Sequence, residues 1–263
     1  MTAVIDRIAE RRDKIAAKVG RGLETKPFSK LIRSGTWADH GRAEGSNFEQ
    51  ALVFGTVTPE AYRDLLGNIW PVYSALEDRA QELADDPIAG PFLDERLNRL
   101  PVLERDLEHF YGPLWRDNIT VLDVSQEYAE RIRTSPPARY IAHHYTRYLA
   151  DLSGGQDIHK GLAKGFGEAV EGLRLYVFDL PDVMEFKVAY RGKLDAMPVS
   201  NEDKLMMIEE VALAYEYNIE MTADLALKHN VERPEGAPEG RPGPPAHVLA
   251  AMKAEAEAGN GHH

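Results

Sequence analysis

The segment from His143 to Gln156, HHYTRYLADLSGGQ, constrains the fold more than any other part of this sequence. It begins with the spacing of an amphipathic helix and then has Ser153-Gly154-Gly155 where the helical pattern should continue. A glycine inside a helix costs about 1 kcal/mol relative to alanine, so sequences keep one where something must approach the backbone closely. Gly/Ser pairs also permit a sharp bend. The segment therefore predicts a kinked helix against a flat ligand, with Asp151 as the ionisable group beside it. The local pattern fits a loop between two helices equally well.

Helical periodicity extends over most of the remaining chain. Thr58 and Pro59 predict the start of a long helix, with threonine as the N-cap and proline in the first turn, and Pro71 predicts a kink inside it. Further helices are predicted over residues 102–110, 125–133, 139–166, 182–195 and 201–229, with Asn201 as the N-cap of the last. Only Leu173–Phe178 has the bulky character of a strand, and without a partner strand we expect an extended connection there. The sequence thus predicts an all-α, single-domain helical bundle.

The two ends of the chain differ from its central part. Residues 1–27 form a charged N-terminal extension, whose helical pattern fits either docking on the core or free movement in solvent. Residues 28–229 form the helical domain. Residues 230–263 are predicted to be a flexible tail, because a segment dense in Pro, Gly and Glu buries too little apolar area to offset its ordering entropy.

Composition excludes several classes of protein. The chain has no cysteine, which excludes disulfides and thiolate-bound metals. Its formal charge of −12 argues against a nucleic-acid partner, because phosphate contacts need clustered Lys and Arg. It has no run of about 20 apolar residues that would span or anchor in a bilayer, and no basic, apolar N-terminal signal is visible. The simplest expectation is a soluble cytoplasmic protein.

His40 is the leading candidate for a metal ligand. It stands four residues before Glu44, so one helical turn brings the two side chains together. A histidine that binds a metal through one ring nitrogen usually donates its other N–H to an acceptor, and Glu44 or a main-chain carbonyl could be that acceptor. Taken alone, a histidine on a helix is more often a solvated or core residue. His143 and His144 are adjacent and point to different helix faces, so we expect one inside and the other in solvent.

The motif YTRYLADLSGGQ, residues 145–156, resembles the distal-helix signature of the haem oxygenases, whose usual form is YTRYLGDLSGGQ. Landmarks of the same family follow in order from about Phe28 to about Leu225. The resemblance implies a fold of the haem oxygenase type, in which haem lies between a proximal helix and the kinked, Gly-rich distal helix. The H-x-x-A-E spacing at His40 resembles the proximal helix, which implies that His40 is the axial ligand of the iron and that Glu44 supports it.

The resemblance also implies how haem is held and attacked. Residues of this chain that match the haem-binding positions are Arg33, Tyr145, Ser153, Lys187 and Arg191, and charge-assisted hydrogen bonds would join the basic ones to the two propionates. Any one of these charges, considered alone, is more often a solvated surface group. The family often has a second basic residue in the first helix, where this chain has Trp37.

On the distal side, the resemblance assigns the catalytic positions. Gly154 and Gly155 leave room for iron-bound oxygen, and Asp151 orders the water that supplies protons. Ala150 departs from the family, which usually has glycine there. Its methyl group would either press on the bound oxygen or be tolerated through a small shift of the helix.

The function implied is oxidative cleavage of haem to biliverdin, CO and ferrous iron. Haem would be cofactor and substrate, O2 the oxidant, and a ferredoxin or flavoprotein reductase the electron donor, because the chain has no nucleotide-binding fingerprint of its own. Two alternatives stay open. One is a haem carrier, sensor or peroxidase-like protein that does not open the ring, as Ala150 would favour. The other is a haem-free protein of the same fold that acts on another small molecule, as thiaminase-type proteins do.

Overall fold

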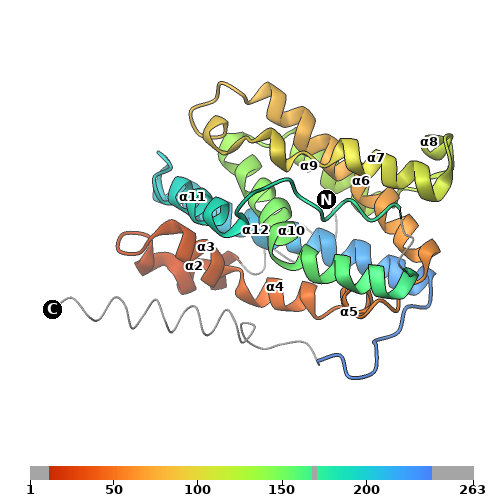
Figure 1. Ribbon diagram of the computed structural model, residues 1–263. Coiled ribbons are helices and arrows are strands. Elements are labelled where there is room, and N and C mark those ends of the chain that lie inside the picture. Colours follow the sequence, from red (N-terminus) through yellow and green to blue (C-terminus); the bar gives the residue numbers. More distant parts are fainter. Residues whose placement is uncertain (1–11, 168–170, 239–263) are drawn as a thin grey trace.

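The computed structural model describes residues 12–167 and 171–238 of the 263-residue chain. Within these residues it consists of helices, turns and irregular connections, without a strand (Figure 1). The all-α prediction is therefore confirmed, and Leu173–Phe178 is an irregular connection as expected. No helix in the described ranges is long and apolar enough to cross a membrane.

The helices follow in chain order: α2 (Arg12–Val19), η1 (Gly20–Gly22), α3 (Phe28–Gly35), α4 (Trp37–Glu44), α5 (Asn47–Phe54), α6 (Pro59–Glu82), η2 (Gly90–Phe92), η3 (Glu95–Leu97), α7 (Leu100–Tyr111), α8 (Trp115–Asn118), α9 (Asp123–Arg133), α10 (Pro137–Phe166), α11 (Val183–Asp195) and α12 (Asn201–Lys228). Three long helices, α6, α10 and α12, organise the bundle. α6 packs mainly against α7 and α9, whereas α10 packs against α12 and α5. In Figure 1, α2 to α5 lie on the opposite side of α10 and α12 from α7 to α9. The core between these layers is closed by fully buried aromatic side chains, among them Tyr62, Tyr73, Tyr128 and Tyr217.

Side-chain caps fix the beginnings of two of the three long helices, α6 and α12. The Thr58 hydroxyl accepts a hydrogen bond from the Ala61 amide at 3.2 Å, so this predicted N-cap is confirmed. The predicted cap Asn201 is wrong by one residue, because Ser200 and Asp203 form a reciprocal capping box and Asn201 is the first residue of α12. α6 is helical on both sides of Pro71, and the kink there stays a prediction.

α10 is a single helix from Pro137 to Phe166, and this excludes the alternative of a loop at Gly154-Gly155. Its ribbon changes direction partway along its length in Figure 1, as expected for a helix kinked at a Gly/Ser segment. Within the motif, Thr146, Tyr148, Leu149, Asp151, Leu152 and Gly155 are buried, whereas Ser153, Gly154 and Gln156 are exposed.

Two further glycines let α10 approach α5 at backbone distance. A Cβ atom on Gly161 would lie 2.3 Å from the carbonyl oxygens of Leu52 and Val53, and one on Gly165 would lie 2.2 Å from the carbonyl oxygen of Gly55. Gly55 itself ends α5 with φ of +70°, in the left-handed region that favours glycine. No side chain fits at these contacts, so they fix the spacing of the two helices.

His143 and His144 are both buried, and the prediction that one of them meets solvent is wrong. The reason is that neighbours cover two adjacent faces of α10. His143 lies under α12, with its Nε2 3.0 Å from Glu210, and His144 lies under α11, with its Nδ1 2.9 Å from the Tyr190 hydroxyl. Burial lowers the pKa of His144 to about 3, so its ring is neutral at physiological pH.

The described part of the N-terminal extension docks on the core. α2 packs against α3 and α12 through Ile15 and Val19, which are both buried. Residues 1–11 lie outside the described part, as does most of the C-terminal tail, including His262 and His263.

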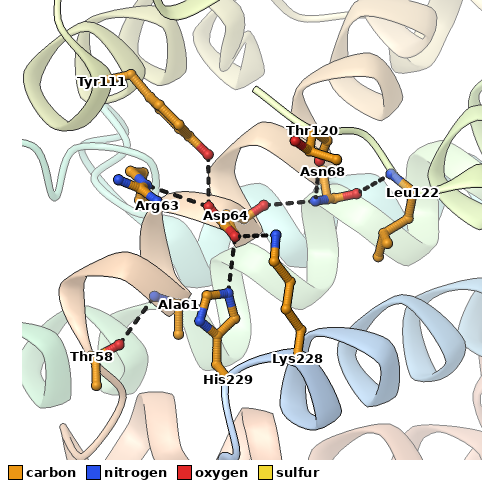
Figure 2. Close-up of polar contacts among 10 residues, drawn as sticks. All are labelled: Thr58, Ala61, Arg63, Asp64, Asn68, Tyr111, Thr120, Leu122, Lys228 and His229. Carbon is orange, nitrogen blue, oxygen red and sulfur yellow. Dashed lines mark hydrogen bonds and ion pairs between the residues drawn. The ribbon is translucent and has the colours of Figure 1, made fainter. Parts of the chain in front are cut away.

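A polar cluster around Asp64 ties the end of α12 to α6 and α7 (Figure 2). The buried Asp64 carboxylate accepts hydrogen bonds from the Tyr111 hydroxyl at 2.8 Å and from Lys228 Nζ at 2.6 Å. His229 Nε2 lies 2.9 Å from the same carboxylate. One side chain therefore holds the last residues of α12 against the opposite layer of the bundle.

We expect Asp64→Asn to lower the free energy of unfolding at pH 7 by about 1–2 kcal/mol. Burial alone would raise the pKa of Asp64, but hydrogen bonds from Lys228, Tyr111 and His229 outweigh burial and lower that pKa to about 2. The carboxylate therefore stabilises the folded state above its unfolded pKa of about 4, and this contribution disappears as the pH falls through the folded pKa. Urea denaturation of the two proteins at several pH values measures the difference.

The difference between wild type and Asp64→Asn should narrow steadily between pH 4 and pH 2. Asp78→Asn, an exposed aspartate on the same helix, is the matched control and should change stability by less than about 0.5 kcal/mol. A stability loss at Asp64 that does not depend on pH would contradict the electrostatic explanation.

Candidate functional site

A cavity of about 450 Å³ lies between α4, α5, α6, α10 and α12. Seven of the predicted site residues line it: His40, Glu44, Ala150, Asp151, Ser153, Gly154 and Gly155. The cavity combines apolar walls from α5 and α6 with polar groups from α4 and α10. This composition is typical of sites for small organic ligands.

His40 stands at the α4 wall of the cavity. Its ring stacks on Trp37 with centroids 5.3 Å apart and meets the edge of Tyr215 at 5.8 Å, so its orientation is fixed. Its Nδ1 is buried and lies 3.8 Å from Glu44 Oε2, which is too long for a hydrogen bond. Burial lowers the pKa of His40, and Arg33 adds to this effect while Glu44 opposes it. A neutral imidazole with an available nitrogen lone pair therefore faces the cavity.

Glycine is present at the two motif positions, Gly154 and Gly155, for different structural reasons. A Cβ atom on Gly154 would meet nothing within 4 Å, so its missing side chain leaves open space in the cavity. A Cβ atom on Gly155 would lie 2.7 Å from Tyr176 Cδ1, so Gly155 is required by packing as well. Ala150 lies one turn before Gly154 and places its methyl group on the same wall.

Asp151 belongs to a hydrogen-bond network that three helices supply. Its carboxylate accepts a hydrogen bond from the Tyr73 hydroxyl of α6. Arg147, one turn earlier on α10, lies 3.5 Å from Asp151, donates to the Tyr73 oxygen at 3.1 Å and donates to Asn218 of α12 at 2.8 Å. Burial raises the pKa of Asp151, which Arg147, the Tyr73 hydrogen bond and Arg99 partly offset. The carboxyl is thus held in a defined orientation and binds a proton more readily than a solvated aspartate.

The other four predicted site residues, Arg33, Tyr145, Lys187 and Arg191, do not line the cavity. They gather beside it. Lys187 Nζ donates to the Ser153 hydroxyl at 2.8 Å, between α11 and α10. Arg33 and Arg191 lie near enough to act on the pKa values of both Lys187 and Tyr145. Burial lowers the pKa of Lys187 to about 8, with further lowering by Arg191 and Arg33. The pKa of Tyr145 is raised by burial, and the same two arginines oppose that rise. Arg33, Lys187 and Arg191, with Tyr145 beside them, form a basic rim that suits a ligand with carboxylates at one edge.

His40 is the imidazole that the cavity lining offers to a metal. Across the described ranges, no group of three or more His, Cys, Asp or Glu side chains is placed to hold a metal ion. One neutral imidazole, open space at Gly154 and a basic rim together suit an iron whose other ligands come from a macrocycle with acidic substituents. The residues present therefore fit haem.

The family model described as "Heme oxygenase" matches residues 26–224, about three quarters of the chain. This chain is a member of the haem oxygenase family. The recognition made from YTRYLADLSGGQ is confirmed, and so is the helical fold expected from it.

Curated relatives and solved structures agree with this membership. Heme oxygenase 1 of Synechocystis is 34% identical over 198 residues, which is 74% of this chain and 82% of the relative. The heme oxygenase of Porphyra purpurea is 36% identical over 200 residues, covering 74% of this chain and 84% of the relative. The crystal structure of Synechocystis heme oxygenase-1 in complex with heme superposes with a TM-score of 0.74 at 29% identity, covering 88% of this chain and 99% of that one.

The sequence analysis missed several residues in and around this cavity. Tyr73 belongs to the apolar stripe of α6 and gave no sign of a polar role, and Asn218 gave none either. Arg147 had a usable signal, because it stands four residues before Asp151 and so one turn away on the same helix face. Glu49 of α5 also lines the cavity and was not identified.

We expect alanine at the two motif glycines to have opposite effects on stability. Gly154→Ala gains helix propensity without a clash and should raise the free energy of unfolding by up to about 1 kcal/mol, while its methyl group occupies the cavity and weakens haem binding. Gly155→Ala forces Tyr176 to move and should lower the free energy of unfolding by about 1–2 kcal/mol. Urea denaturation and absorption titration with haem measure both effects. Stability changes of the same sign at the two positions would contradict the assignment.

Proposed function

We propose that this chain is a haem oxygenase that binds haem between α4 and α10 and opens its ring with O2 and external electrons, releasing biliverdin, CO and ferrous iron. The single observation that supports this most is that His40 lines the same cavity as Gly154 and the Asp151 network. When bound, haem supplies the iron that reacts with O2 and the ring carbon that is oxidised. The protein residues have to bind, orient and supply protons.

Each group of residues has one task in this proposal. His40 binds iron as a neutral imidazole, which donates less electron density than a thiolate would. Gly154 leaves the distal face open. The carboxyl of Asp151 is oriented by Tyr73 and Arg147, so it holds a proton near the reacting face without a strong acid in contact. The basic rim holds the propionates and sets the rotation of the ring in the cavity.

The chain depends on an external electron donor in this proposal. A ferredoxin or a flavoprotein reductase would supply the electrons, because the sequence carries no nucleotide-binding motif. We place the reaction in the cytoplasm together with such donors.

A second candidate function rests on Ala150. Its methyl group lies on the cavity wall one turn from Gly154, where it narrows the space available on the distal side. A protein that binds haem and returns it intact would result if this methyl group prevents ring opening. An Ala150→Gly variant that gains turnover, with unchanged haem affinity, would favour this second function over the first.

We expect His40→Ala to weaken haem binding at least tenfold, because the cavity offers no second imidazole in its lining. An absorption titration measures affinity, and incubation of the haem complex with a reductant and O2 measures ring opening. Wild-type protein should lose its Soret band and gain biliverdin absorbance. His109→Ala, which changes an exposed histidine outside the cavity lining, is the matched control. Unchanged haem affinity in His40→Ala would instead favour a haem-free function.

Haem affinity should decrease as the pH rises above about 8. Burial, Arg191 and Arg33 lower the pKa of Lys187 to about 8, so its ammonium loses its proton above that pH. A propionate stabilises the charged form, so binding takes up a proton there and weakens by up to tenfold for each further pH unit. Absorption titrations at pH 7 to 10 measure this dependence.

Lys187→Gln should bind haem more weakly at pH 7 and lose most of the pH dependence. Lys193→Gln changes an exposed lysine on the same helix and should leave both unchanged. A wild-type affinity that stays constant from pH 7 to pH 10 is the result that would refute this role of Lys187.

A further inference from the structure

Glu49 places a second carboxyl group on the wall of the cavity. It lies in the first turn of α5, where its amide donates to the N-cap hydroxyl of Ser46 at 3.3 Å. Its side chain lines the cavity together with Asp151 and Arg147 of α10. The backbone contacts of α5 with α10 at Gly161 and Gly165 hold the two helices at fixed spacing. The two carboxyls therefore share one cavity because of the fold and not through a flexible loop.

The surroundings of Glu49 favour its protonated form. Burial is the largest cause and raises the pKa of Glu49 to about 7, with Asp151 and Glu44 raising it further and Arg147 opposing the rise. Other titratable groups face the cavity from neighbouring elements: Asp157 of α10, Tyr176 of the connection and Tyr215 of α12. Asn218 is the polar uncharged group that α12 adds.

Glu49 and Asp151 differ in how their oxygens are bound. Asp151 is held by Tyr73 and Arg147. Across the described ranges, no side-chain donor lies within hydrogen-bond distance of the Glu49 carboxyl, which borders the cavity directly. Two carboxyls that share one guanidinium are both ionised only at a cost, so the pair retains a proton near neutral pH. Glu49 is the member that no side-chain hydrogen bond in the described part of the chain holds, so it is the one placed to release that proton.

We propose that Glu49 is a proton-relay residue that acts through Asp151. It passes a proton across the cavity to Asp151 and takes the next one from solvent. This inference rests on the proposed haem oxygenase function, in which reduction of O2 consumes protons. In the step itself, the Glu49 carboxylic acid loses its proton to cavity water, the water protonates the Asp151 carboxylate, and Glu49 remains as a carboxylate. No electrons move, and the charge of the pair is unchanged. Glu49 then recovers its proton at the open side of the cavity.

The first test measures protonation without haem. Carbon-13 NMR of protein labelled at the glutamate carboxyl carbon should show one resonance that titrates between pH 6 and pH 8 and is missing in Glu49→Gln. Asp151→Asn should shift the midpoint of that resonance to lower pH, because one source of repulsion is removed. A Glu49 resonance that titrates near pH 4.5, as a solvated glutamate does, would overturn the proposal.

The second test uses the ferric haem complex and azide, which is an anion throughout the range from pH 6 to pH 8.5. Azide affinity of wild type should fall roughly tenfold as Glu49 ionises, because a negative charge appears in the cavity. Glu49→Gln should bind azide with nearly constant affinity, and its rate of ring opening should lose the wild-type decline over the same range. Glu60→Gln, an exposed glutamate at the start of α6, should match wild type in both.

The outcomes separate this inference from the proposed function. Identical pH profiles for wild type and Glu49→Gln, with biliverdin formed by both, would refute the role of Glu49 and leave the haem oxygenase function intact. Absence of biliverdin from wild type would refute the function, while the carbon-13 titration would still decide whether Glu49 carries a proton. Thermal unfolding of Glu49→Gln followed by circular dichroism checks that the variant is folded.

Discussion

The structure depends on the backbone contact between α5 and α10. Gly161 and Gly165 lie so close to the carbonyl oxygens at the end of α5 that even a methyl group would overlap with them. This contact fixes how far apart the two helices stand, and both helices contribute residues to the cavity lining. A wider spacing would separate Glu49 from Asp151, and a narrower one would remove the open space at Gly154. Gly161 and Gly165, which set the helix spacing, and Gly154, which leaves open space in the cavity, therefore act together to shape the site.

The charges around the cavity are arranged for chemistry more than for stability. Buried ion pairs contribute little net stability, because desolvation offsets most of the Coulomb attraction. Here Arg147 lies near both Asp151 and Glu49, and Arg99 adds a weaker attraction at Asp151, while Glu44 adds a third carboxyl group beside Glu49. The carboxyl groups therefore outnumber the guanidinium groups that act on them. A structural ion pair would have matched one carboxylate to one cation. An excess of carboxyl groups in low-dielectric surroundings instead raises their affinity for protons, which is the property that a proton-supplying site needs.

Local patterns predicted the features that are encoded within one helix. Thr58 was readable as a cap because a cap and its partner amide are three residues apart. The spacing of His40 and Glu44 alone did not identify a ligand, and the resemblance to the family's proximal helix was needed to make His40 the leading candidate. Tyr73 and Asn218 were not readable, since their partners lie more than seventy residues away along the chain. The same limit explains His143 and His144. Helix geometry shows that the two side chains point to different faces of α10, but it led to the wrong prediction that one of them meets solvent, because only the tertiary structure determines that α12 and α11 cover both faces.

The domain boundary expected at residue 229 does not coincide with the boundary of the site. After α12, the chain returns across the end of α4, where Arg233 donates to the carbonyl oxygen of Gly45 at 3.0 Å. Carbonyl groups at the end of a helix lack partners within the helix, and a guanidinium there is stabilised by hydrogen bonding and by the helix dipole. Arg233 also donates to the carbonyl oxygen of Pro238, and Pro238 lines the cavity. The segment from 231 to 238 thus joins the C-terminal end of the helix that carries His40 to the cavity wall. Although its composition resembles that of a linker, the described part of this segment lies against the cavity, because Arg233 attaches it to the end of α4 and also holds Pro238 through a hydrogen bond within the segment.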